Sequence, residues 1–191
     1  MIEHALRANV RAGRPRIAEV GGGDGTLMLR IAREMTELDS AELTLVDRQP
    51  VLSAETTALY AKQNWQVTVC ASDVFDWLAE EQASYDAIVA NLFLHHFEPP
   101  QLAKLFALAA LRTPLFVACE PLRARLPLIG SRLVGLLGCN DVTRHDAVLS
   151  VRAGFKDKEL SQLWPQGGSW KVDEGRAGLF SHLFIAKSRE R

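Results

Sequence analysis

Short apolar runs alternate with amphipathic stretches along most of this chain. The runs at residues 16–20, 85–91 and 115–120 are almost continuously apolar, which is typical of strands buried on both faces of a sheet. Because helix-like stretches separate them, the pattern predicts parallel strands joined by crossover helices. The predicted strands are residues 16–20, 42–47, 66–70, 85–91 and 115–120, and the predicted helices are residues 2–12, 26–37, 50–63 and 101–111.

The pattern changes after residue 120. Residues 121–139 are apolar and basic without a clear period, and a helix is predicted over 141–153, between an Asn140 or Asp141 cap and Gly154. A short helix is predicted over residues 157–164. The last two predicted strands, 170–174 and 179–187, are separated by only four residues, so they are expected to form an antiparallel hairpin.

Composition and charge narrow the class of protein. With 191 residues and 48% hydrophobic residues, the chain can bury a full core as one domain over residues 1–191. A net charge of -1 provides no overall field that would draw it to nucleic acid or to an anionic membrane. Three cysteines without C-x-x-C spacing predict reduced thiols and neither a disulfide framework nor a zinc site.

Targeting signals are not expected. Residues 1–16 are polar and arginine-rich, unlike a secretory signal peptide. The most apolar segment, residues 126–138, is interrupted by Arg132 and is too short to span a bilayer. These features favour a cytoplasmic protein without a membrane span.

The first predicted strand runs directly into a glycine-rich turn, Gly21-Gly22-Gly23-Asp24-Gly25. Glycine allows positive φ and lets a ligand approach the backbone closely. The turn also opens a helix, whose N-terminal N–H groups favour electron-rich ligand atoms. A nucleotide-like ligand is therefore expected here, although Thr26 stands where the dinucleotide pattern G-x-G-x-x-G requires its third glycine.

Four segments in order along the chain resemble class I S-adenosylmethionine-dependent methyltransferases. Glu19 and the glycines form the spacing E-x-G-x-G-x-G, which is similar to the first motif of that family. Asp47 ends the second predicted strand, Ser72-Asp73-Val74 follows the third, and Asn91-Leu92-Phe93-Leu94-His95-His96-Phe97 follows the fourth. The resemblance implies a Rossmann-like three-layer α/β/α sandwich with a seven-stranded, mostly parallel sheet and an antiparallel last strand.

The same resemblance implies S-adenosyl-L-methionine as cofactor and S-adenosyl-L-homocysteine as product. Asp47 would hold the ribose hydroxyls, and the segment after the fourth strand would lie beside the methionine moiety. Phe93, Phe97 or Trp77 could stabilise the sulfonium through a ring face. Helix capping is the alternative for Asp73, and bracing of the turn is the alternative for Glu19. The expected cofactor-binding residues are Glu19, Gly21, Gly22, Gly23, Asp47, Arg48, Ser72, Asp73, Val74, Asn91 and Leu92.

Three histidines are candidate catalytic residues, because a base is needed if the methyl acceptor must lose a proton. His95 and His96 follow the fourth strand, where the resemblance puts the reacting centre. His145 lies on a predicted helix, one turn after Asp141, which could orient it. A structural role in the loop or helix is the alternative for each. His182, inside the last strand, is expected to be structural, and His4 to face solvent.

Residues 121–154 form an insert that we expect to act as a substrate cap. Its leucines would give an apolar wall, and Arg123, Arg125 or Arg144 could hold a carboxylate or phosphate. The same apolar segment could instead form a homodimer contact.

The predicted function is S-adenosylmethionine-dependent methyl transfer to a small hydrophobic metabolite at oxygen or carbon. A nucleic-acid (RNA) methyltransferase is the first alternative, although residues 91–94 read N-L-F-L and not N-P-P-Y, and the net charge is -1. An NAD(P)-dependent oxidoreductase is disfavoured by Thr26 and the hairpin. A non-catalytic binding protein with the same fold is the third alternative.

Overall fold

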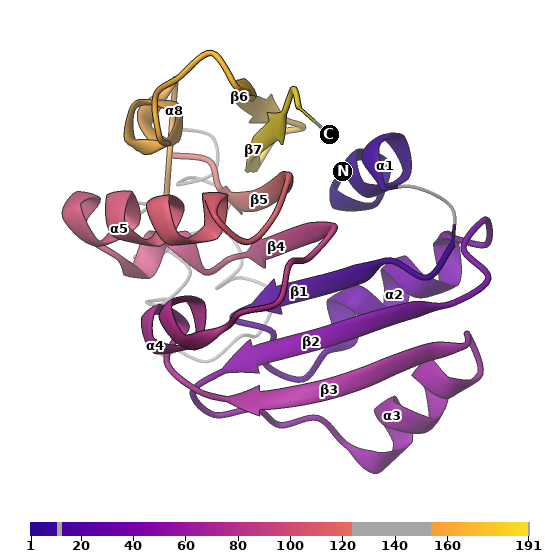
Figure 1. The fold of residues 1–191 in the computed structure, drawn as a ribbon. Coiled ribbons are helices and arrows are strands. Elements are labelled where there is room, and N and C mark those ends of the chain that lie inside the picture. The colour runs from indigo at the N-terminus through magenta and orange to yellow at the C-terminus, as the bar shows by residue number, and fades with distance from the viewer. Residues whose placement is uncertain (11–12, 124–153, 191) are drawn as a thin grey trace, which may run out of the picture.

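Seven strands form one mixed sheet in the order β3-β2-β1-β4-β5-β7-β6 (Figure 1). The computed structural model describes residues 1–10, 13–123 and 154–190. Strands β1 to β5 pair in parallel, and β7 is antiparallel to both β5 and β6. The strands are β1 Arg16–Val20, β2 Ala41–Asp47, β3 Trp65–Ala71, β4 Ala87–Asn91, β5 Leu115–Pro121, β6 Trp170–Ala177 and β7 Ser181–Ser188.

Helices cover both faces of the sheet, which confirms the three-layer Rossmann-like architecture. Buried side chains of α1, α2 and α3 pack on one face, and those of α4, α5 and α8 pack on the other. The described helices are α1 Ile2–Asn9, α2 Thr26–Glu34, α3 Ala54–Ala61, α4 Val74–Glu80, α5 Pro99–Ala110 and α8 Glu159–Leu163, with a 3-10 turn, η1, at Leu94–His96.

The central strands are buried on both faces, as their continuous apolar sequence predicts. Every residue of β5 is buried, and its side chains alternate between the two helical layers. Phe116 packs against Phe106, Trp164 and Phe184, with ring centroids 5.4 to 6.2 Å apart. Each large apolar side chain buried in this way contributes roughly 1.5–3 kcal/mol to stability.

Several predicted boundaries were wrong for local reasons. The helix expected from residue 50 begins at Ala54, because the Ser53 hydroxyl accepts a hydrogen bond from Thr56 N at 3.0 Å and caps the helix there. Strand β6 continues to Ala177, so the hairpin connection is shorter than predicted and turns at Gly178, whose φ is +72°. The helix predicted over 141–153 lies outside the described residues.

The topology gathers the carboxyl ends of β1 to β5 along one edge of the sheet (Figure 1). In this class of sheet, ligands bind outside that edge. No helix in residues 1–10, 13–123 and 154–190 is long and apolar enough to cross a membrane. Those same ranges hold no group of three or more His, Cys, Asp or Glu side chains arranged to bind a metal ion.

Candidate functional site

The glycine turn between β1 and α2 depends on left-handed backbone. Gly21, Gly23 and Gly25 have φ of +72°, +49° and +71°, values that other residues adopt at a cost. A β-carbon added at Gly21 would overlap the Phe93 ring, whereas one added at Gly23 would have no atom within 4 Å. The turn is therefore packed from one side and leaves its backbone open at Gly23, as a ligand cradle requires.

Asp47, at the end of β2, holds the turn in place. Its Oδ2 accepts a hydrogen bond from Gly23 N at 3.0 Å, and its Oδ1 accepts one from Gln49 N at 2.9 Å. Each carboxylate oxygen keeps further lone-pair capacity, so Asp47 can also accept from ligand hydroxyls. The β1–β2 register thus places a carboxylate that can accept from two hydroxyl groups beside an open backbone, as binding of a ribose requires.

A cavity of about 520 Å³ lies beside this turn. Three aromatic rings form its apolar side: Phe97 packs edge-to-face against Phe93, at 5.0 Å, and against Phe75, at 5.5 Å. The lining contains five of the expected cofactor residues and one candidate base, and it consists of Val46, Asp47, Arg48, Ser72, Asp73, Val74, Phe75, Phe93, His96, Phe97 and Gln101.

Asp73 has the capping role that was the alternative for it. Its Oδ1 accepts a hydrogen bond from Phe75 N at 2.8 Å and caps α4. The capping bond leaves Asp73 in the cavity wall next to Ser72. One residue therefore starts the helix and lines the cavity.

Asn91 and Leu92 line a different cavity from Asp47, Arg48 and residues 72–74. They line a cavity of about 400 Å³ with residues of α1 and α2 and with Cys119 and Ser181. Leu92 has φ of +51° and is 55% exposed. The segment after β4 therefore lines two cavities: Asn91 and Leu92 line this one, while Phe93, His96 and Phe97 line the one beside Asp47.

Glu19 is buried on β1 behind the glycine turn. Its Oε2 is without a hydrogen-bond partner among the described residues. Burial, together with the charges of Asp24 and Asp47, raises the pKa of this carboxyl to about 8. Glu19 is therefore neutral at pH 7 in the folded chain, and a cationic ligand group nearby would favour its ionised form.

We expect Glu19 to make the fold less stable as pH rises from about 4.5 to 8. In that window the unfolded chain has lost the Glu19 proton and the folded chain keeps it, so unfolding releases a proton. The stability should fall by about 1.4 kcal/mol per pH unit from this group alone. Urea unfolding of Glu19→Gln at pH 6 and pH 8 should show a smaller pH dependence than wild type. An unchanged slope would contradict the burial argument, and Glu55→Gln, at an exposed position, is the control.

The two histidines after β4 have different surroundings. His95 Nδ1 lies 2.8 Å from Glu120 Oε2, and the side chain is only 6% exposed. His96 packs its ring on that of His95, with centroids 4.2 Å apart, and lines the larger cavity. Burial lowers the pKa of His96, and His95 lowers it further while Glu120 acts in the opposite direction. A neutral imidazole that can accept a proton is therefore present in the cavity at pH 7.

Glu120 is a residue that the sequence analysis missed. It is the next-to-last residue of β5 and has a fully buried side chain, and its Oε1 accepts hydrogen bonds from Phe93 N at 2.9 Å and Leu94 N at 2.8 Å. The signal that could have identified it is an acidic residue at the end of a predicted buried strand. The same signal identified Asp47.

Of the remaining candidate residues, the structure describes three and does not describe the other three. Trp77 is buried against Tyr85, with ring centroids 5.5 Å apart, and does not line the cavity of about 520 Å³, which favours a core role for it over contact with the sulfonium. His182 is buried in β7, 2.7 Å from Glu174, and His4 is exposed, as predicted for both. His145, Arg125 and Arg144 lie outside the described residues.

Comparison with known proteins defines the class. A family model described as a methyltransferase domain matches residues 17–112, half of the chain. The chain belongs to this family, as a class I S-adenosylmethionine-dependent methyltransferase. Its cofactor is S-adenosylmethionine, which the open backbone at Gly23 and the free acceptor capacity of Asp47 fit.

Curated relatives match a limited part of the chain. The tRNA1(Val) (adenine(37)-N6)-methyltransferase of Enterobacter sp. (strain 638) is 35% identical over 83 residues, covering 42% of this chain and 33% of that protein. The protein of the same description from Citrobacter koseri is 28% identical over 80 residues, with the same coverage. The match therefore spans about a third of the length of each relative.

Solved structures share the fold over almost the whole chain. The plantazolicin methyltransferase BamL, in complex with a triazolic desmethylPZN analog and SAH, has a TM-score of 0.62 at 16% identity, covering 97% of this chain and 81% of that chain. The pyocyanin biosynthetic protein PhzM has a TM-score of 0.63 at 16% identity, covering 97% and 54%. Magnesium protoporphyrin IX methyltransferase from Synechocystis PCC 6803, with bound SAH, has a TM-score of 0.54 at 14% identity, covering 98% and 80%.

Proposed function

We propose that this methyltransferase acts on a small, largely hydrophobic molecule and transfers the methyl group to an oxygen or carbon atom. The observation that carries the proposal is His96, an imidazole of lowered pKa that lines a cavity walled by Phe75, Phe93 and Phe97. Apolar walls with few polar groups are typical of small-molecule sites. A neutral imidazole could take the proton that a hydroxyl or acidic carbon loses.

The cofactor supplies an electrophilic methyl group on a positively charged sulfur. Asp47 would accept hydrogen bonds from the ribose, while Ser72 and Asp73 would bind the adenine edge. The open backbone at Gly23 would allow close approach, and the ring of Phe93 or Phe97 would face positive charge. Because methyl transfer needs an in-line arrangement of acceptor, methyl and sulfur, this positioning accounts for much of the rate.

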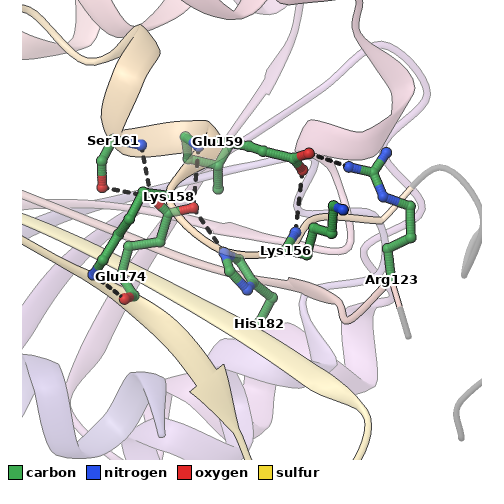
Figure 2. Close-up of polar contacts among 8 residues, drawn as sticks. Arg123, Lys156, Lys158, Glu159, Ser161, Glu174 and His182 are labelled. Atoms are coloured by element: carbon green, nitrogen blue, oxygen red, sulfur yellow. Dashed lines mark hydrogen bonds and ion pairs between the residues drawn. The ribbon is translucent and has the colours of Figure 1, made fainter. Parts of the chain in front are cut away.

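We propose further that residues 121–154 carry acceptor-binding groups, with His145 as an additional candidate base. The support is the position of the segment's described ends. Arg123 N donates to Phe155 O and Phe155 N donates to Pro121 O, each at 2.9 Å, so the chain leaves and returns at one point beside β5. Arg123 also pairs with Glu159, the first residue of α8 (Figure 2). That point is next to Glu120 in β5. Because Glu120 contacts residues 93–95, the segment starts and ends close to the loop that carries His95 and His96.

Solved structures of the same fold support a small-molecule acceptor by their descriptions. They include proteins described as acting on plantazolicin and on magnesium protoporphyrin IX, and one described as an O-methyltransferase family protein from Burkholderia thailandensis. The tRNA methyltransferase relatives favour a second candidate, methylation of an adenine in RNA. The acceptor screen below separates the two.

His96→Gln tests the proposal. The purified protein is incubated with S-adenosylmethionine and a panel of phenols, hydroxy-heteroaromatics, activated carbon acids and tRNA, and products are identified by mass. We expect wild type to methylate a small hydroxyl or carbon acceptor, and His96→Gln to lower kcat about 100-fold or more. Its affinity for S-adenosylhomocysteine should stay close to wild type.

His4→Gln is the matched control, because it makes the same substitution at an exposed histidine of α1. It should leave turnover unchanged. Methylation of tRNA alone would replace the proposal with the second candidate. Turnover retained in His96→Gln would remove His96 as the base and leave His145 as the candidate to test.

A further inference from the structure

Glu120 is a fully buried carboxylate whose three hydrogen bonds all go to one short segment. Its Oε1 accepts from Phe93 N and Leu94 N, and its Oε2 lies 2.8 Å from His95 Nδ1. Its side chain has no exposed surface. A carboxylate removed from water is costly unless such donors compensate it. Any other conformation of residues 93–95 would therefore leave the Glu120 carboxylate uncompensated.

The segment that Glu120 holds forms one side of the site. Phe93 packs its ring on Gly21 so closely that no β-carbon fits there, and it is part of the cavity wall beside Asp47. His96 follows His95 directly, and the two rings lie 4.2 Å apart. The position of both cavity residues thus depends on a backbone that Glu120 fixes from a strand 25 or more residues further along the chain.

We propose that Glu120 is a positioning residue for methyl transfer. By fixing the Phe93 and Leu94 backbone and the His95 ring, it places the Phe93 side chain against the glycine turn and the His96 ring in the cofactor cavity. The carboxylate can only accept, so His95 donates from Nδ1, which fixes the orientation of the ring that supports His96. The effect on catalysis through His96 rests on the proposed role of His96 as base. The effect through Phe93 concerns cofactor binding alone.

Glu120 also contributes charge at His96. Its carboxylate raises the pKa of His96 against the larger effect of burial and the effect of His95. The other charged groups in the same cavity are Asp47, Arg48 and Asp73. Removing the Glu120 charge while these stay in place should lower the His96 titration midpoint further.

The experiment compares Glu120→Gln with Glu174→Gln. Glu174 is a matched control, because it is also a fully buried glutamate that contacts a histidine (Figure 2). It does not line the cavity that contains His96. The readouts are calorimetry with S-adenosylhomocysteine and NMR titration of the His96 ring. We expect Glu120→Gln to weaken S-adenosylhomocysteine binding about tenfold, as the loss of one charge-assisted hydrogen bond would, and to lower the His96 midpoint. Glu174→Gln should lower stability and change neither readout.

A Glu120→Gln protein that binds S-adenosylhomocysteine as wild type does, with an unchanged His96 midpoint, would overturn the inference. If Glu120→Gln does not fold, His95→Asn and His95→Leu decide the question. Asparagine keeps a donor near the position of Nδ1 and should retain affinity, while leucine should lose it. Equal affinity in the two variants would equally overturn the inference. Failure of His96 as the base would appear in turnover of His96→Gln and would leave these binding measurements intact.

Discussion

Gly23→Val is expected to weaken S-adenosylhomocysteine binding by about 100-fold or more, the largest effect on binding that we predict for a single substitution in the turn. Gly23 has φ of +49°, which costs roughly 1–2 kcal/mol for a residue with a β-carbon. The added side chain would project into the open space beside the turn, where the cofactor meets the backbone. Any shift that relieved the strain would break the hydrogen bond from Gly23 N to Asp47 Oδ2.

Calorimetry with S-adenosylhomocysteine measures this effect. Gly168→Val is the matched control, because an added β-carbon at Gly168 also meets open space but its backbone has no positive φ. It should bind as wild type does. If Gly23→Val retained wild-type affinity, the cofactor would have to bind away from the glycine turn, and the assignment of the site would be wrong.

Glu174→Ala is expected to cause the largest loss of stability, about 3–5 kcal/mol. The buried Glu174 carboxylate accepts hydrogen bonds from His182 Nε2 at 2.7 Å, Leu160 N at 3.0 Å and Ser161 N at 2.7 Å, and also from the Ser161 hydroxyl (Figure 2). Alanine would leave these donors without a partner in the interior. His182 would be affected most, because its Nδ1 already lacks a partner among the described residues.

Urea unfolding at pH 7 measures this loss, with Glu159→Ala as the control. Glu159 belongs to the same cluster and pairs with Arg123, but its side chain is 35% exposed, so its removal should cost less than about 1 kcal/mol. Equal losses in the two variants would show that the bonds to Glu174 contribute no more than a surface ion pair.

The Glu174 contribution should also depend on pH. Burial alone would raise the pKa of this carboxyl, but the hydrogen bonds from His182 and Ser161 outweigh burial and lower it below its ordinary value of 4.5. Because the folded-state pKa is the lower one, the stabilisation is present above about pH 4.5 and is lost as pH falls below that value. The difference in stability between wild type and Glu174→Ala should therefore shrink in acid.

Local sequence was sufficient to predict an element where the physical cause of its bounds lies in neighbouring residues. Strand β1 has the predicted bounds, because a continuous apolar run is followed at once by glycines that require positive φ. Asp47 ends β2 as predicted, and the parallel register brings it to the glycine turn. The start of α3 was predicted too early because the Ser53 cap decided it, and Pro50 favoured an earlier start.

The sequence by itself determined the class of sheet and the glycine turn, because these follow from periodicity and from residues close together in the chain. It also predicted Asp47, Ser72 and Asp73 as cofactor-binding residues, and these line one cavity beside the turn. Only the tertiary structure distinguished the surroundings of His95 from those of His96, since Glu120 on the neighbouring strand β5 contacts the His95 ring. It also assigned Asn91 to a different cavity from Asp47. These outcomes depend on strand register and on a buried carboxylate that needs donors, and neither leaves a periodic signal in the sequence.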